Sequence, residues 1–284
     1  SHDDDITLSI PILTVDHNGL EQHLTNIYIK LLADCYKTYC PDLKIVFSKE
    51  ISLDEFLNDE ALVLLNVDGS MVYGNYRYFS PNNLNVKLPK DLLETWDWGT
   101  TKIYQESMRA EKRSDSVQGF TYQKIADEFE IVFNDDGAGE IADLVAIRVD
   151  NDKIYISLFH CKYCPLTDGT AIPGARLSDV YEVCGQASRS VKWLYTGEKF
   201  FDRLLERYQK SLSKGFDRIL KGAPQQLEIL RNKCHDHEFI FNFVIVQPAV
   251  SAKKVSDEQL TVLGTSYSYI KSISGSDIKV IVSP

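Results

Sequence analysis

An α/β fold is predicted, in which helices cover both faces of a central mixed sheet. Two observations indicate it: short apolar runs of strand length alternate with longer segments of helical periodicity, and the 284-residue chain is 44% hydrophobic. That content is enough for one large domain or two smaller ones. The pattern changes near Thr95. We therefore expect an N-terminal α/β accessory region at residues 1–95 and a second domain at residues 96–284.

The accessory region begins with an apolar, β-rich run at residues 6–15. Residues 43–47 and 61–67 are further apolar runs of strand length. A helix is expected over residues 20–39, where apolar side chains recur at every third or fourth position (Leu20, Leu24, Ile27 and Leu31).

The second domain is expected to begin with a helix at residues 114–129, capped by Ser114 or Ser116. A strand at residues 130–133 and a turn at 134–139 follow. Two strands, 141–149 and 153–162, flank Asp150-Asn151-Asp152 and should form an antiparallel hairpin, because these residues favour turns. The remaining expected elements are helices at 177–195, 200–212 and 225–233, a strand at 239–246, a helix at 257–272 and a strand at 277–282.

Composition limits the function classes. The chain has 31 basic and 41 acidic residues, so its net charge of −10 gives no overall attraction for nucleic acid. No run approaches the roughly 18 apolar residues that a membrane helix requires, so no membrane association is expected. Six scattered cysteines do not form a disulfide scaffold and favour a reduced, cytoplasmic protein.

One segment reverses the overall charge. Residues 189–221 contain nine basic and four acidic residues. Within this segment Arg203, Arg207, Lys210 and Lys214 share one face of the expected helix. Such a face either follows a phosphate backbone or is an ordinary solvated surface, and the sequence favours neither.

The predicted hairpin brings three chemically useful side chains together. His160 and Lys162 are two residues apart on a strand and so point to the same side, whereas Cys161 points to the other. Asp143 begins the preceding strand, and pairing about a turn near Asn151 places it beside His160. A carboxylate with a second ligand can hold a divalent cation, and a neighbouring lysine can stabilise the charge of a reacting phosphate. These residues therefore suggest phosphodiester hydrolysis.

Asp143 followed by His160-x-Lys162 on a hairpin resembles the PD-(D/E)xK, or restriction-endonuclease-like, nuclease superfamily. The resemblance covers residues 112–195 and extends toward 284. It implies an α-β-β-β-α-β core and Mg²⁺- or Mn²⁺-dependent cleavage of DNA, in a setting such as restriction or phage defence. It also implies that Asp143 and the main-chain carbonyl of Cys161 are metal ligands and that Lys162 is the catalytic lysine.

This sequence departs from the family pattern at one position, since His160 stands where the family has an acid. Imidazole is a poor ligand for Mg²⁺. Three outcomes stay open: His160 binds the metal or positions the water, a carboxylate from elsewhere replaces the acid, or the site is inactive. Glu140 is the first candidate for such a carboxylate, and Glu182 is the second.

Polar residues on the flanking helices are further candidates. Gln118 lies on the helix before the first strand, and Gln186 on the helix after the hairpin. Both are expected to face the site and to contact phosphate or metal-bound water, together with Arg189 and Lys192. The alternative for these helix residues is a solvated face.

Two rival interpretations stay open. Cys161-x-x-Cys164 has zinc-ligand spacing, with other cysteines and histidines available in Cys184, Cys234, His235 and His237. Alternatively, the nuclease fold is inactive and either binds DNA or docks to another protein. The chain begins at Ser1 without a methionine, so we also expect a piece of a longer protein, with a helicase or other large polypeptide as partner. Cutting of both DNA strands by one site per chain would favour a homodimer.

Overall fold

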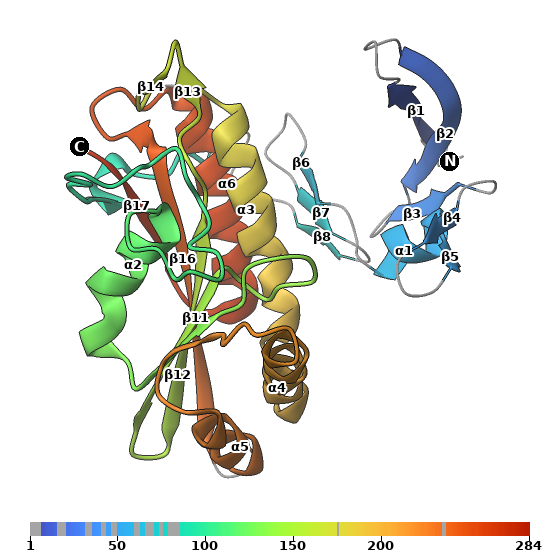
Figure 1. The fold of residues 1–284 in the computed structure, drawn as a ribbon. Helices are drawn as coiled ribbons and strands as arrows, with labels where there is room; N and C mark the ends of the chain where they lie inside the picture. The colour runs from blue at the N-terminus through green and yellow to red at the C-terminus, as the bar shows by residue number, and fades with distance from the viewer. Residues whose placement is uncertain are drawn as a thin grey trace. The chain divides into compact units, whose positions relative to one another are not determined.

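The computed structural model divides the chain into two compact units, Ser1–Leu84 and Asn85–Pro284, and each is described here by itself (Figure 1). The described residues are 7–15, 21–31, 36–40, 44–46, 50–59, 63–65, 71–73, 76–78, 86–174, 176–234 and 237–284. None of the helices in this part of the chain combines the length and the hydrophobicity that crossing a bilayer requires.

The first unit consists mainly of short antiparallel sheets. The first sheet contains β1 (Thr7–Val15), β2 (Glu21–Leu31) and β3 (Tyr36–Tyr39). The other elements of this unit are β4 (Lys44–Val46), β5 (Glu50–Ser52), α1 (Leu53–Asp59), β6 (Val63–Leu65), β7 (Met71–Tyr73) and β8 (Tyr76–Tyr78).

The helix predicted over residues 20–39 is wrong, because this segment contains β2 and β3. Ile27 and Ile29 also alternate at the period of a strand, and they flank Tyr28, which favours strands. Pairing with β1, in which Thr7 lies opposite Lys30, selects this second periodicity. A long-range partner therefore decided between two patterns that the local sequence contains together.

The second unit is built on a seven-stranded mixed sheet with the order β15-β10-β11-β12-β16-β17-β9. In chain order, these strands are β9 (Leu93–Thr95), β10 (Ile131–Asn134), β11 (Leu144–Asp150), β12 (Lys153–Cys161), β15 (Ile219–Lys221), β16 (Glu238–Ser251) and β17 (Ile278–Ser283). Because β9 pairs with β17, the second unit begins before the expected boundary at residue 95.

Strand direction changes across the sheet. β10, β11 and β12 are antiparallel neighbours, and β16 joins the far side of β12 in parallel. β17 and β9 continue in parallel on the other side of β16. The predicted hairpin is confirmed: Asp150 pairs with Lys153, and Asn151 takes the left-handed conformation that a tight turn requires, with φ of 53°.

Helices cover both faces of this sheet (Figure 1). The helix α2 (Val117–Ile125) begins at Ser116, whose side chain accepts a hydrogen bond from the Gly119 amide, as predicted. It packs over one face, where Phe159 and Val244 belong to a buried cluster. The remaining helices are α3 (Ser178–Arg189), α4 (Glu198–Leu212), α5 (Pro224–Asn232) and α6 (Asp257–Ser274).

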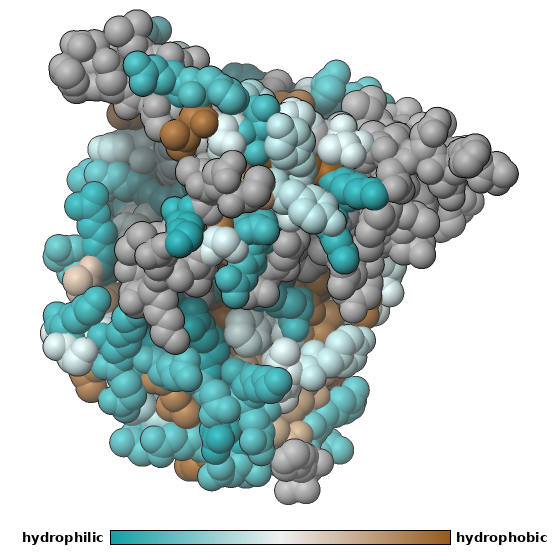
Figure 2. Space-filling model, turned by 90° about the vertical axis from the view of Figure 1, so that its right-hand side faces the viewer, coloured by the Kyte–Doolittle hydropathy of each residue, from teal (hydrophilic) through white to brown (hydrophobic). Residues whose placement is uncertain are grey.

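The long helices α3 and α6 pack against each other over the opposite face (Figure 1). Phe200 and Phe201 of α4 pack edge-to-face, and Phe200 packs on Phe241 of β16. Hydrophilic side chains cover most of the lower part of the face in Figure 2, the end of the second unit at which α4 and α5 lie. The predicted α/β class with a mixed sheet flanked by helices is therefore confirmed.

Candidate active site

The turn between β10 and β11 is held rigidly from inside the protein. Asp135 is completely buried, and its carboxylate accepts hydrogen bonds from the Arg207 guanidinium of α4 and, at 2.7 Å, from the Ile141 amide. Arg207 also donates to the Ala138 carbonyl oxygen at 2.7 Å, and Arg203 donates to that of Gly139, also at 2.7 Å. The two arginines therefore fix the path of the chain that carries the neighbouring acids.

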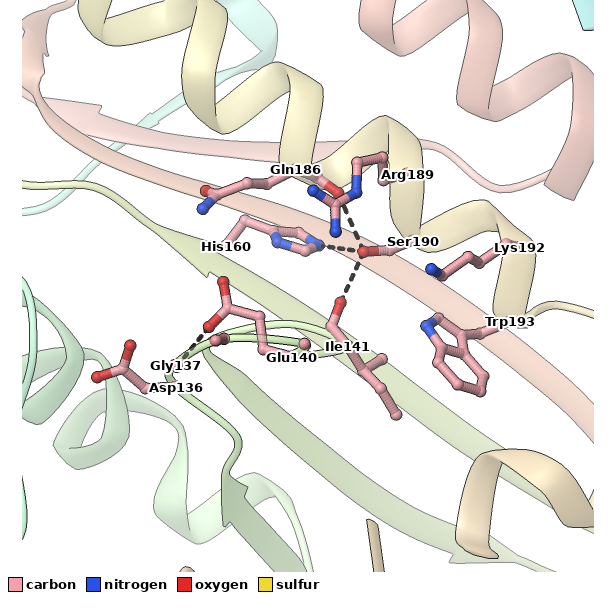
Figure 3. Close-up of a pocket in the computed structure, with 12 residues that line it drawn as sticks. Asp136, Gly137, Glu140, Ile141, His160, Gln186, Arg189, Ser190, Lys192 and Trp193 are labelled. Carbon is pink, nitrogen blue, oxygen red and sulfur yellow. Dashed lines mark hydrogen bonds between the residues drawn. The ribbon is translucent and has the colours of Figure 1, made fainter. Parts of the chain in front are cut away.

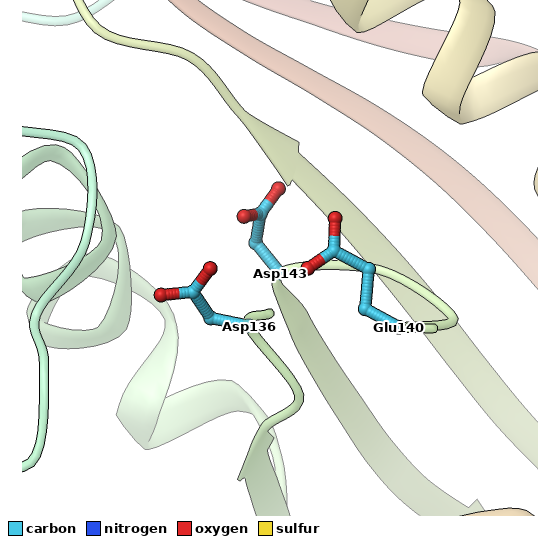
Figure 4. A group of neighbouring side chains, drawn as sticks. All are labelled: Asp136, Glu140 and Asp143. Carbon is cyan, nitrogen blue, oxygen red and sulfur yellow. The ribbon is translucent and has the colours of Figure 1, made fainter. Parts of the chain in front are cut away.

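Three carboxylates converge beside this turn. One carboxylate oxygen from each of Asp136, Glu140 and Asp143 lies within 4.8 Å of the others (Figure 4). Among the described residues, this group alone brings together three side chains able to hold a metal ion in that way. Carboxylate oxygens are the ligands that Mg²⁺ and Mn²⁺ prefer, so we refer to these three residues as the acidic cluster.

The acidic cluster is electrostatically unfavourable by itself. Burial, with a smaller contribution from Glu140, raises the pKa of Asp143 well above its usual value. Burial also raises the pKa of Glu140 to about 7, with the charges of Asp136 and Asp135 adding to the effect. The described residues form no salt bridge with the acidic cluster. A divalent cation would supply the missing counter-charge.

Asp143 is oriented by two donors. Gln118 on α2 donates its side-chain amide to Oδ1 at 2.8 Å, and the Cys161 main-chain amide donates to Oδ2 at 2.8 Å. Gln118 in turn accepts a hydrogen bond from the Met108 amide at 3.0 Å. Gln118 faces the site, as expected, but it is completely buried and contacts Asp143 instead of presenting a surface to nucleic acid.

His160 is buried beside the acidic cluster, with its Nε2 3.0 Å from the Ser190 hydroxyl. Burial, and then the charge of Arg189, lowers the pKa of His160 to about 3, so the ring is neutral. The Ser190 hydroxyl also lies within hydrogen-bond distance of two carbonyl oxygens, those of Ile141 at 2.7 Å and Gln186 at 3.1 Å, which can only accept. Because a hydroxyl has one proton, donation to either carbonyl assigns the donor role at His160 to Nε2–H. Nδ1 therefore carries a lone pair, and it has no partner among the described residues.

Lys162 lies between two acids. Its ammonium group is 2.6 Å from Oε1 of Glu182 on α3 and 3.2 Å from Oε2 of Glu106. Burial opposes the charged form of Lys162, but these two partners outweigh that effect and raise its pKa. Burial also raises the pKa of Glu106, whose charge in turn acts on Asp143. Lys162 is thus a permanent cation linked to the acidic cluster through Glu106.

A pocket of about 320 Å³ opens beside the acidic cluster (Figure 3). In Figure 3 the ring edge of His160 that carries Nδ1 faces the side of the pocket where Glu140 lies. Trp193 and Lys192 lie at the end of the pocket away from Asp136. The pocket is lined by the side chains of Asp136, Glu140, His160, Gln186, Arg189, Lys192 and Trp193, among others.

The remaining residues that the sequence predicted for the site lie in different places in the structure. Gln186, Arg189 and Lys192 all line this pocket, whereas Glu182 pairs with Lys162 and lies outside the acidic cluster. Arg207 does not belong to an exposed basic face, because it is 9% exposed and bound to the turn.

The cysteine arrangement gives no support to the zinc interpretation. Cys161 and Cys164 are buried, and the Cys161 thiol lies near the Thr121 hydroxyl on the α2 side of the sheet. No cysteine among the described residues joins a metal-ligating group. His235 lies outside the residues that the structure describes.

The residues of the site that the sequence did not predict include two acids, Asp136 and Glu106. Asp136 lies in the run Asn134-Asp135-Asp136-Gly137, which the sequence presents as a turn, and nothing local distinguishes a ligand from a turn-former. Glu106 lies in an irregular segment before α2, where no periodicity predicts its direction. The only available signal for Asp136 was its position between a buried strand and the predicted ligand Glu140.

Comparison with protein-family models, with curated proteins and with solved structures found no significant match to this chain. The chemistry of the site is therefore inferred from its own geometry.

Proposed function

We propose that the second unit is a divalent-cation-dependent nuclease that hydrolyses DNA phosphodiester bonds. The acidic cluster carries this proposal, because three converging carboxylates, with Asp143 buried and Asp136 and Glu140 half-buried, suit Mg²⁺ or Mn²⁺. The raised pKa values of Asp143 and Glu140 show that these two groups lack a counter-charge. A bound cation would supply an acidified water and neutralise phosphate charge.

The order of elements supports a restriction-endonuclease-like core. A helix precedes three antiparallel strands, β10 to β12, and α3 follows them. The strand β16 then joins β12 in parallel. With the additional elements β13, β14, α4, β15 and α5 set aside, this order is compatible with the α-β-β-β-α-β core of the superfamily that the Asp143…His160-x-Lys162 pattern resembles.

The protein side chains have separable roles in this proposal. Asp143, Glu140 and Asp136 hold the cation, and Gln118 keeps Asp143 in its orientation. Lys162 stays protonated, so it stabilises negative charge on the phosphate rather than accepting a proton.

His160 takes a different role from the acid that it replaces. Neutral His160 offers Nδ1 as a hydrogen-bond acceptor for a water molecule in the pocket. Glu140, rather than His160, joins Asp136 and Asp143 as the third ligand of the cation. This arrangement corresponds to the replacement of the family's acid by a carboxylate from elsewhere in the chain.

Cleavage of supercoiled plasmid with Mg²⁺ or Mn²⁺ tests the proposal. Asp143→Asn and Lys162→Met should each lower the rate by about a hundredfold or more, as loss of a charged group at a reacting centre does. Asp150→Asn, at the far end of the same strand, is the matched control and should cut like the wild type.

Two results would contradict the nuclease proposal. If Asp143→Asn and the wild type cut equally fast, the activity comes from a contaminant. If the wild type binds DNA but cuts with neither cation, the domain is an inactive nuclease fold that serves as a binding module.

A further inference from the structure

A second recess lies beside the acidic cluster. It has a volume of about 260 Å³ and we call it the Tyr163 recess, since Tyr163 directly follows Lys162. The pocket of Figure 3 is called the Trp193 recess here. The Tyr163 recess is lined, among others, by Tyr104, Glu106, Ser107, Arg109, Arg113 and Tyr163.

Direct contacts join the Tyr163 recess to the acidic cluster. The Ser107 hydroxyl donates to the Asp136 carboxylate. Glu106 pairs with Lys162 and accepts a hydrogen bond from the Tyr163 amide at 3.2 Å. A ligand in this recess would therefore be held at a fixed position relative to the acidic cluster.

The Tyr163 recess presents aromatic and cationic groups to solvent. Tyr104 and Tyr163 are 37% and 38% exposed, although both are large rings. Arg109 is exposed, and its guanidinium forms no ion pair with the described residues. The Arg109 backbone has a φ of 53°, an unfavourable conformation for a residue other than glycine and one that is common at binding sites.

The Trp193 recess offers the same two chemistries on the other side of the acidic cluster. Lys192 lies with Nζ 5.8 Å from the centre of the Trp193 ring, and Arg189 lines the same wall. Two buried polar atoms there, Nε1 of Trp193 and Oε1 of Gln186, have no hydrogen-bond partner among the described residues. Buried polar groups of this kind need a partner, which ordered water or a polar ligand in the recess would supply.

These observations favour single-stranded over double-stranded nucleic acid as the ligand. Every base has a flat face that can stack on an aromatic ring, but in a duplex those faces are covered by neighbouring base pairs. The net charge of −10 gives the chain no overall attraction for a polyanion, so ring stacking is expected to contribute to affinity beside the local cations Arg189 and Lys192.

We propose that the substrate is single-stranded DNA, which crosses the acidic cluster with one flanking nucleotide in the Trp193 recess and another in the Tyr163 recess. This inference rests on the proposed nuclease function for the identity of the ligand. The two recesses would place the phosphate between them at the acidic cluster.

Fluorescence anisotropy in EDTA separates binding from cleavage. The probes are a fluorescein-labelled oligothymidine and the same strand paired with oligoadenine. We expect tighter binding of the single strand, and Tyr163→Ala or Trp193→Ala should weaken it about 5- to 150-fold, the effect of losing one stacked base. Tyr155→Ala is the matched control, because Tyr155 lies on β12 but outside both recesses.

Trp193 packs against Phe200, so its replacement can also disturb folding. Tyr104→Ala and Arg109→Gln change exposed side chains and should weaken single-strand binding without changing the thermal midpoint. Equal or tighter binding of the duplex, or unchanged affinity in all four recess variants, would overturn the inference while leaving a metal-dependent nuclease in place. Selective single-strand binding without cleavage in Mg²⁺ or Mn²⁺ would instead support the inference and contradict the nuclease proposal.

Discussion

Replacement of Arg207 by methionine removes the charge that compensates Asp135 while keeping much of the side-chain volume. Asp135 is completely buried and Arg207 is 9% exposed, so no solvent can take over the lost contacts. Loss of one partner from a buried ion pair costs about 3–5 kcal/mol. We therefore expect Arg207→Met to lower the free energy of unfolding by that amount in urea denaturation.

The pH dependence of this loss tests its cause. Burial already raises the pKa of Asp135 against the opposing charge of Arg207, and removal of Arg207 raises it further. A carboxyl whose folded pKa lies above its unfolded value loses stability as pH rises through the folded pKa. The deficit of Arg207→Met should thus be larger at pH 8 than at pH 5.

Two variants control for packing. Arg203→Met removes a hydrogen bond from a partly exposed side chain to the same turn and should cost only about 1 kcal/mol. The double variant Asp135→Asn with Arg207→Met removes both charges of this pair and should recover part of the loss. If Arg207→Met costs less than about 1 kcal/mol and shows no pH dependence, the ion pair does not hold the turn.

Three further outcomes are expected. The free energy of unfolding of the wild type should fall by about 2 kcal/mol between pH 7 and 5, because the folded pKa of His160, about 3, lies below its unfolded value and the unfolded state binds the extra proton. In urea titrations, His160→Gln should lose this pH-dependent part of the stability. An unchanged pH dependence in that variant would contradict the assignment to His160. Mn²⁺ affinity, measured by calorimetry, should weaken by at least about tenfold for each pH unit below 7, because the cation displaces a proton from Glu140 and the pKa of its neighbour Asp143 is raised as well. Glu140→Gln should reduce that dependence. Gly139→Ala should cost more than about 1 kcal/mol, since its φ is +76° and a Cβ would lie 2.6 Å from the Arg203 guanidinium; Gly185→Ala, in open space on α3, should cost nothing in the same thermal melts.

Local chemistry predicted the part of the site that lies on the hairpin. Residues 150–152 favour a turn strongly, so the sequence predicts the register that pairs Leu144 with Phe159 and thereby brings Asp143 close to His160. Because side chains alternate along a strand, the sequence also predicted that His160 and Lys162 share one side of the sheet. In the structure, His160 contacts Ser190 and Lys162 pairs with Glu182 of α3. Both inferences needed only short-range rules.

The missed features depend on distant partners. Arg207 shares a helical face with basic neighbours, and its burial depends on Asp135, which lies 72 residues earlier in the chain. The short strand β15 takes its place only by pairing with β10. Residues 21–31 have both helical and strand periodicity, and pairing with β1 and β3 decides between them. Helical periodicity therefore fails where an antiparallel neighbour competes for the same residues.

The parallel pairing of β12 with β16 bears on the order in which the second unit folds during synthesis. Its partners are far apart in the chain, with His160 paired to Ile245, whereas the β11–β12 hairpin closes locally. Contacts over such separations form late. A nascent chain that ends before α4 contains all three residues of the acidic cluster but neither the Arg207 that fixes their turn nor β16. We therefore expect the acidic cluster to be held in place only after α4 and β16 have also left the ribosome.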